Sequence, residues 1–242
     1  MDALIYTAMS GAEKALHAQQ VHANNLANME TGGFRANLEL ATSQAVPGYG
    51  YDDRHMGQMQ SNTVVTRQGT VKETGRDLDV AIDGDGYLAV QGPDGAEAYT
   101  RAGALTLDAS GALSINGYPV LGDGGPIVLP EFTSVSIGQD GTISVQTVGQ
   151  ADMQPVDKLK LVKADAADIT KNETGLIVSR NGDTLNTDPS VLVRGGHLEG
   201  SNVSAVEEMV ATMNLNRSFE VQMKLYQAAD SMTQTGNRLI SA

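Results

Sequence analysis

The sequence predicts an α+β fold, in which long N- and C-terminal helices form a coiled-coil-like assembly core and the central part is an antiparallel all-β domain. Residues 2–28 and 203–240 are poor in glycine and carry apolar side chains at helical spacing. Residues 76–199 contain short apolar segments separated by turn dipeptides that end in glycine. A chain with one helix at each end can pair its ends internally, with neighbouring copies, or both. This layout is typical of a polymer subunit.

The first helix carries a strict seven-residue repeat. Its stripe advances in steps of four and three residues, through Ile5, Met9, Ala12, Leu16, Gln19, Ala23 and Leu26. That spacing is typical of a coiled-coil seam. The seam buries little apolar area, because two members are alanine and one is glutamine, so a lone helix would be marginal. We expect partner helices in an assembly to order it. The alternative is an ordinary amphipathic helix packed on its own domain.

The first helix should end near Asn28, because Thr31-Gly32-Gly33 interrupts its pattern. Residues 36–75 then predict an extended loop or arm, since Pro47-Gly48-Tyr49-Gly50 is followed by mostly polar residues. A structureless loop of this length is uncommon inside a compact domain. We therefore expect this segment to become ordered against a neighbour.

Residues 76–199 predict an antiparallel β domain, either a sandwich or a barrel. In residues 78–82, apolar side chains alternate with Asp79 and Ala81, which is the period of a strand and places Asp79, with Asp77, on a solvated face. Further short apolar segments follow at 105–107, 113–115, 135–137, 143–145, 159–162, 176–178 and 191–193. Eight dipeptides offer the positive φ of tight turns: Asp83-Gly84, Asp85-Gly86, Asp94-Gly95, Ser110-Gly111, Asn116-Gly117, Asp123-Gly124, Asp140-Gly141 and Asn181-Gly182.

The second helix is expected after Gly200. Ser201 and Asn202 could both cap it, and the spacing of Ser204 and Glu207 fits a capping box. A helix of about 35 residues would be ~52 Å long, which exceeds the width of a small domain. Part of it should therefore pack beyond its own chain. The predicted organisation is a helix in 1–35, an arm in 36–75, a β domain in 76–199 and a helix in 200–242.

Charge and composition exclude several classes of protein. The net charge is −13, and residues 76–199 hold 18 acidic and 8 basic side chains, so most of the excess lies in the β domain. The helical ends are close to neutral, as a packing surface should be. No basic stripe is present to neutralise phosphates, which argues against nucleic-acid partners. No apolar run is long enough for insertion into a membrane, and no secretory leader is recognisable.

No catalytic, cofactor or metal site is expected. The chain has no cysteine, and His17 and His22 are five residues apart, so they do not share a helix face as a metal pair would. The segment 83–86, Asp-Gly-Asp-Gly, lacks the spaced ligands of a calcium loop, so we interpret it as a strand-end turn. Phosphate loops and nucleophile elbows are also missing. We therefore do not expect an enzyme.

Several motifs resemble those of the bacterial flagellar rod and hook protein family. In chain order, they are Asn24-Asn25-Leu26-Ala27-Asn28, Thr31-Gly32-Gly33-Phe34-Arg35, Leu78-Asp79-Val80-Ala81-Ile82, Tyr99-Thr100-Arg101-Ala102-Gly103, Glu199-Gly200-Ser201-Asn202-Val203 and Arg217-Ser218-Phe219-Glu220. They span nearly the whole chain. One departure is Gly32, where the family usually has proline, which should loosen the turn after the first helix without moving it.

The resemblance implies a structural subunit of the proximal rod of the flagellar basal body, because the opening residues 1–11 and the modest length fit that member best. The terminal helices would polymerise into an inner tube and transmit torque across the periplasm. The implied partners are copies of the chain, other proximal and distal rod proteins, and the flagellar type III export apparatus, which would export it without a cleavable signal peptide. The alternatives are a distal rod or other axial protein, a secreted β-domain adhesin, and an enzyme built on the β domain.

The resemblance and the stripes together predict an assembly interface on the terminal helices. The expected residues are Ile5, Met9, Ala12, Leu16, Ala23, Asn25, Leu26, Asn28 and Phe34 near the first helix, and Asn202, Val206, Met209, Met213, Arg217, Phe219 and Met223 near the second. We also expect the two helices to pair with each other and with neighbouring subunits through the large apolar members of these sets. Methionine suits such a surface because its flexible side chain adapts to different partners.

Overall fold

The computed structural model describes residues 2–45, 55–150 and 152–240. The chain divides into two compact units, each drawn from separate parts of the sequence. The helical unit comprises Met1–Ala27, Asn37–Asn62 and Ser204–Ala242, and the β unit comprises Asn28–Ala36 and Thr63–Val203. The chain therefore passes from one unit to the other four times. The boundaries differ from the expected ones, because the β unit also takes in residues 28–36 and 63–75.

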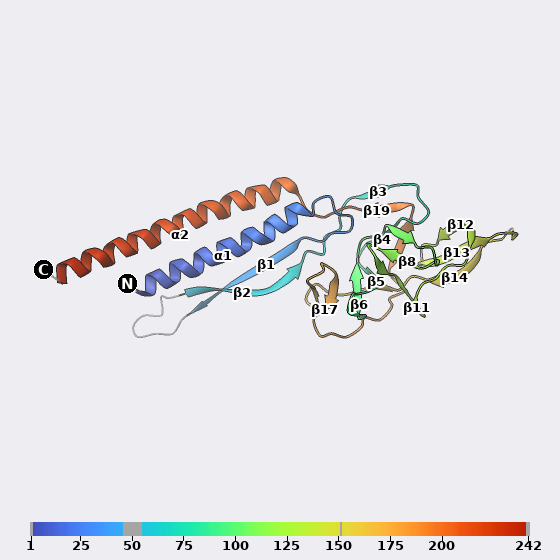
Figure 1. Cartoon of the computed structure of the whole chain (residues 1–242), viewed down its shortest axis with the longest axis horizontal. Helices are drawn as coiled ribbons and strands as arrows, with labels where there is room; N and C mark the ends of the chain where they lie inside the picture. Colours follow the sequence, from blue (N-terminus) through green and yellow to red (C-terminus); the bar gives the residue numbers. More distant parts are fainter. Residues whose placement is uncertain (1, 46–54, 151, 241–242) are drawn as a thin grey trace. The chain divides into compact units, whose positions relative to one another are not determined.

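The two predicted helices are present in the helical unit. Helix α1 spans Asp2–Ala27 and helix α2 spans Ala205–Ile240. They lie side by side and run in opposite directions, as Figure 1 shows and as the contacts of His22 with Glu208 and of Gly11 with Gln222 require.

Helix α2 begins one turn later than its first cap candidates. The backbone N–H of Glu207 donates to Ser204 Oγ at 3.5 Å, which makes Ser204 the N-cap. Ser201 and Asn202 lie before the helix and do not cap it. The capping box at Ser204 and Glu207 was therefore the correct signal.

Strands occupy much of the segment that we expected to be a loop or arm, so a structureless loop is wrong for the described residues. Strands β1 (Asn37–Ala45) and β2 (His55–Val64) form a two-stranded sheet, and β3 (Val71–Glu73) follows. Strand β1 contacts α1 within the helical unit. The mostly polar composition of these strands did not predict them. Pairing with each other and, for β1, contact with α1 stabilise them.

The β unit consists of small antiparallel sheets. The largest has the order β15 (Leu161–Val162), β5 (Tyr87–Gln91), β6 (Glu97–Thr100), β17 (Ile177–Ser179) and β16 (Ile169–Lys171). Two sheets have three strands: β7 (Leu105–Leu107), β8 (Leu113–Ile115) and β9 (Tyr118–Pro119) form one, and β12 (Phe132–Ile137), β13 (Thr142–Thr147) and β14 (Gln154–Lys158) form the other. Three pairs complete the unit: β4 (Val80–Asp83) with β18 (Leu192–Gly195), β3 with β19 (His197–Glu199), and β10 (Leu121–Gly122) with β11 (Gly125–Pro126). The antiparallel β domain is thus confirmed.

Strand β5 separates two apolar clusters. Leu88 and Val90 point into the larger cluster, and Tyr87 and Ala89 point into the smaller one. Successive side chains of a strand face opposite sides, so four consecutive buried residues mean that both faces are covered. The same holds around β4, where Asp79 is only 4% exposed. The solvated face that we expected for Asp79 is therefore wrong.

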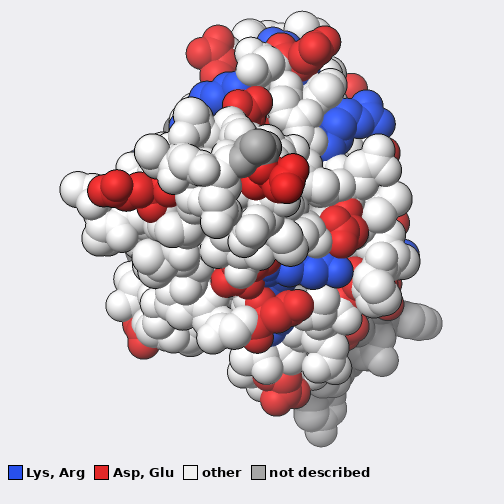
Figure 2. All heavy atoms as spheres, turned by 90° about the vertical axis from the view of Figure 1, so that its right-hand side faces the viewer, with Lys and Arg blue, Asp and Glu red and all other residues white. Residues whose placement is uncertain are grey.

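Asp79 is accommodated by polar partners. Its carboxylate accepts a hydrogen bond from Thr74 Oγ1 at 2.7 Å and lies 3.5 Å from Arg76 NH1. The predicted turns are otherwise well placed: seven of the eight glycines have positive φ, and at the remaining turn Gly125 adopts it instead of Gly124. Figure 2, viewed from the side of β12–β14, shows more acidic than basic side chains, in keeping with the acidic composition of residues 76–199.

Candidate assembly surfaces

Small residues make the contact between α1 and α2. Ala12 and Ala15 of α1 and Ala229 of α2 are buried, and a Cβ added at Gly11 would lie 2.9 Å from the side-chain amide of Gln222. Small side chains let two helix backbones approach closely. Met9 and Leu16 of α1 are 59% and 47% exposed, and Met209 and Met213 of α2 are 49% and 54% exposed, whereas Ile5, Leu26 and Phe219 are partly buried. The predicted pairing of the two helices through the four exposed residues is therefore wrong, and their contact with neighbouring copies stays a prediction.

Polar groups tie the helices together at the other end of the contact. Asn25 is buried, and its amide Nδ2 donates to Glu208 Oε1 at 3.1 Å and to the carbonyl of Asn37 at 3.0 Å. Its Oδ1 accepts from the backbone N–H of Asn37 at 2.8 Å. His22 Nδ1 also contacts Glu208. Asn25 therefore joins α1, α2 and the start of β1 inside the helical unit, and it is not a surface residue.

The opposite face of α2 carries a row of exposed apolar side chains, which we call the α2 ridge. It consists of Val206, Met209, Val210 and Met213, which are 71%, 49%, 46% and 54% exposed. Their spacing of three and four residues places them on one helix face. A soluble monomer rarely leaves such a contiguous apolar row uncovered. The α2 ridge is thus a candidate surface for a partner.

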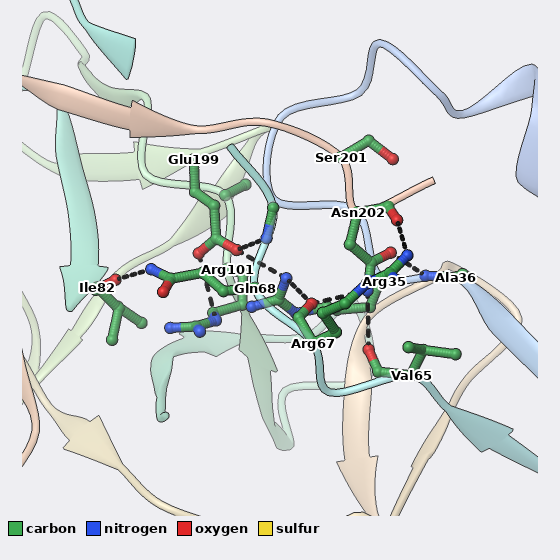
Figure 3. Close-up of polar contacts among 12 residues, drawn as sticks. Arg35, Ala36, Val65, Arg67, Gln68, Ile82, Arg101, Glu199, Ser201 and Asn202 are labelled. Carbon is green, nitrogen blue, oxygen red and sulfur yellow. Dashed lines mark hydrogen bonds and ion pairs between the residues drawn. The ribbon is translucent and has the colours of Figure 1, made fainter. Parts of the chain in front are cut away.

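A buried ion cluster lies in the β unit, where three distant segments meet (Figure 3). Glu199, at the end of β19, lies 2.7 Å from Arg35 NH1 and 3.4 Å from Arg101 Nε. It also accepts the backbone N–H of Gly69 at 2.8 Å. All three charged side chains are at most 2% exposed. Breaking such a buried pair from one side leaves a charge without compensation, which is costly.

Burial shifts the pKa of several groups around this cluster. Desolvation lowers the pKa of Arg101, and the nearby Arg35 acts in the same direction, while Glu199 opposes both. Burial raises the pKa of Tyr87, whose ring centre lies 5.8 Å from the Arg101 guanidinium. Burial also lowers the pKa of Lys171 to about 8. Lys171 Nζ donates to the carbonyl of Arg35 and lies 3.7 Å from the centre of the Phe34 ring.

Asn202 closes the polar network beside this cluster (Figure 3). Its Oδ1 accepts the backbone N–H of Ala36 at 2.7 Å, and its Nδ2 donates to the carbonyls of Val65 and Arg67 at 3.0 and 2.9 Å. These bonds join the segment before β1, the end of β2 and the segment before α2. Asn202 is 6% exposed, so this residue too acts inside the chain instead of on an assembly surface.

The remaining predicted interface residues vary in exposure. Ala23, Arg217 and Met223 are exposed, whereas Ile5, Leu26, Asn28, Phe34 and Phe219 are partly buried. Sequence reasoning missed Arg35, Arg101 and Glu199 as a site, although each stands in one of the family-like motifs. Each of the three charged residues stands within two residues of a glycine, which is the one sequence feature that they share. Nothing near them in the sequence indicated that they would form one cluster.

Comparison with known proteins identifies the family. Three family models match: "Flagella basal body rod protein" at residues 5–35, "Flagellar hook protein FlgE/F/G D1 domain" at 81–145, and "Flagellar basal body rod FlgEFG protein C-terminal" at 194–239. The flagellar basal-body rod protein FlgF of Escherichia coli K12 is 40% identical over 249 residues, covering 100% of this chain and 99% of that protein. The chain belongs to the FlgF family of flagellar basal-body rod proteins. FlgF of Salmonella typhimurium is also 40% identical, and FlgF of Buchnera aphidicola is 30% identical, both over 100% of this chain.

As a FlgF-family protein, the chain is a structural rod subunit of the flagellar basal body. The ion cluster takes one charged residue from each matched region: Arg35 from the first, Arg101 from the second and Glu199 from the third. The cluster therefore joins the three family regions within one unit. Among the described residues, no group of three or more His, Asp or Glu could hold a metal ion, and no helix is both long and apolar enough to span a membrane.

Proposed function

We propose that this rod subunit polymerises by packing the exposed apolar faces of its terminal helices on those of neighbouring subunits, and that the resulting rod transmits torque across the periplasm. The observation that carries the proposal is the α2 ridge. The two helices pack on each other through small residues, so the large apolar side chains remain available for a second contact.

The exposed apolar residues of α1 add to this surface. Tyr6, Met9 and Leu16 are 60%, 59% and 47% exposed. Burying a large apolar side chain stabilises a contact by about 1.5–3 kcal/mol, so a few such residues could hold two subunits together. A contact between two different surfaces of identical subunits generates a helical filament when the rotation that it imposes does not close into a ring.

We propose that the residues closest to the helices of neighbouring subunits are Ile5, Met9, Leu16, Ala23, Leu26, Val206, Met209, Met213, Arg217, Phe219 and Met223, whereas Ala12, which was also expected there, is buried against α2. The partners would be copies of this chain and the other proximal and distal rod proteins, and the flagellar type III apparatus would export the subunit. Membership of the rod family and the exposed helix faces support the rod partners.

A charge placed on the α2 ridge tests the proposal. Met213→Glu should abolish or strongly reduce swarming on soft agar and remove the subunit from purified basal bodies, because a carboxylate cannot be buried cheaply in an apolar contact. Ser218→Glu adds the same charge at an exposed residue of α2 that is not spaced three, four or seven residues from any member of the ridge. It should leave swarming near the wild-type level.

Circular dichroism of both purified variants checks that they fold. Normal swarming and normal incorporation of the Met213→Glu variant would refute a contact through the ridge. Equal loss in both variants would point to a general effect of charge on α2 and would also contradict it.

A further inference from the structure

The ion cluster of the β unit holds more positive than negative charge. Arg35 and Arg101 share the carboxylate of Glu199, and Lys171 adds a third cation on the carbonyl of Arg35. A guanidinium group keeps its charge under ordinary conditions. An uncompensated charge inside a protein is strongly destabilising. The cluster therefore favours a further acceptor or anion close by.

The guanidinium of Arg101 also has unused donors. Its NH2 donates to the carbonyl of Gly84 at 2.6 Å, but within the described residues its buried NH1 and Nε have no hydrogen-bond acceptor. Nε is close to Glu199 only as an ion pair at 3.4 Å. Nearly all buried donors in native proteins have a partner, and ordered water or a bound ion often supplies it.

Arg101 lines a cavity of about 100 Å³. Its lining combines the buried residue Arg101 with the exposed residues Thr66, Lys163, Asp85 and Asp165, which form its rim. About 10–15 Å³ of such space is enough for one water molecule, so the cavity has room for a small ion together with several water molecules. Solvent screens the exposed rim charges, whereas the charge of Arg101 is hardly screened. The two rim carboxylates still disfavour a doubly charged anion.

We propose that this cavity binds a small monovalent anion of the size of chloride, held by NH1 of Arg101 and by the hydroxyl of Thr66 and the ammonium of Lys163. The anion offsets the excess positive charge of the ion cluster and accepts the unused guanidinium hydrogen. Burial and the charge of Arg35 both lower the pKa of Arg101, because both disfavour its charged form. A bound anion would offset this effect.

Thermal unfolding of the full chain tests the proposal, with chloride replacing gluconate at constant ionic strength so that screening stays fixed. The melting temperature should rise by about 3–5 °C when chloride reaches ten times its Kd. Lys163→Gln removes a rim donor from an exposed site and should shift the chloride midpoint upward at least several-fold. Lys72→Gln removes the same charge from exposed strand β3, outside the cavity, and should leave the midpoint unchanged.

Crystals soaked in bromide provide a second readout. An anomalous peak within hydrogen-bonding distance of Arg101 NH1 is the expected result. Water alone at this position, or peaks only elsewhere on the surface, would overturn the proposal. A melting temperature that does not depend on chloride, or that depends on it equally in Lys163→Gln and wild type, would overturn it as well.

Discussion

At the scale of single residues, Glu199 balances two buried arginines from opposite parts of the chain. It lies within 3.4 Å of both guanidinium groups and also accepts a backbone N–H. The exposed pair of Asp83 and Arg194, 3.0 Å apart with side chains 57% and 54% exposed, is a natural comparison. The buried pairs should contribute far more to the free energy of unfolding than the exposed pair, because water already solvates the exposed charges.

We predict that Glu199→Gln destabilises the β unit by about 3–5 kcal/mol, since it leaves Arg35 and Arg101 without a carboxylate. For a unit of this size the melting temperature should fall by roughly 10 °C. Denaturant unfolding followed by circular dichroism measures the change. Asp83→Asn is the matched control and should cost less than about 1 kcal/mol. Similar losses in the two variants would show that burial does not set the weight of the pair.

Lys171 predicts a dependence of stability on pH. Burial lowers the pKa of this lysine from 10.5 to about 8, although the Phe34 ring and the carbonyl of Arg35 favour its charged form. Below pH 8 the lysine is charged in both states, so the folded state bears the cost of burying the charge. Between pH 8 and 10 the folded state releases the proton and the unfolded chain retains it. The free energy of unfolding should therefore rise with pH in that window.

Comparison with Lys171→Met isolates this effect. The difference in unfolding free energy, wild type minus variant, should increase by about 1.4 kcal/mol for each unit of pKa difference that the titration crosses. The measurement should stop at pH 10, because burial raises the pKa of Tyr99 to about 12 and makes stability fall at higher pH. A difference that stays flat from pH 8 to 10 would contradict the lowered pKa.

At the scale of elements, segment 28–36 is packed so tightly that only glycine fits at one position. Gly33 has a φ of +69°, and an added Cβ would come 2.1 Å from the backbone nitrogen of Ala102. Its N–H donates to the carbonyl of Glu199 at 2.8 Å. Gly84 has a similar φ of +80°, but nothing lies within 4 Å of its added Cβ. A comparison of substitutions at the two glycines therefore separates the cost of a positive φ from the cost of a steric clash.

Gly84→Ala should cost about 1 kcal/mol, the usual penalty for a side chain in this backbone region. Gly33→Ala should cost several kcal/mol, because the clash with the backbone of residue 102 adds to that penalty and backbone atoms cannot rotate away. Thermal melts of the two purified variants give the comparison. Equal melting temperatures would mean that segment 28–36 moves away from the β unit at little cost.

At the scale of the whole molecule, the β unit is larger than residues 76–199. It takes Arg35 and Ala36 from the N-terminal side, Gly69 from the segment before β3 and Asn202 from the segment before α2. Each makes a buried polar contact that a fragment restricted to 76–199 would lose. The contacts of the ion cluster and of Asn202 therefore bring these flanking segments into the β unit.

We predict that a fragment of residues 28–203 melts at least about 10 °C above a fragment of residues 76–199, because the shorter one leaves Glu199 without Arg35 and Gly69. Circular dichroism melts of both fragments measure this. The same two fragments carrying Glu199→Gln provide the control. This substitution should reduce the difference between their melting temperatures. Equal melting temperatures of the unmutated fragments would show that the β unit begins at residue 76, as expected from the sequence.

Features that depend on short-range patterns could be predicted from the sequence. The two helices, the cap at Ser204, most of the turns and the strands at 105–107, 113–115 and 143–145 follow from periodicity and turn chemistry, which act between residues a few positions apart. The family motifs also indicated a rod protein. Which residues are buried became clear only from the folded chain. Asp79, Asn25, Asn202 and the Arg35–Glu199–Arg101 cluster lie inside because distant segments cover them, and a charged or amide side chain carries no local sign of that cover. Strands β1 and β2 pair with each other and β1 contacts α1, although the composition of both strands is mostly polar.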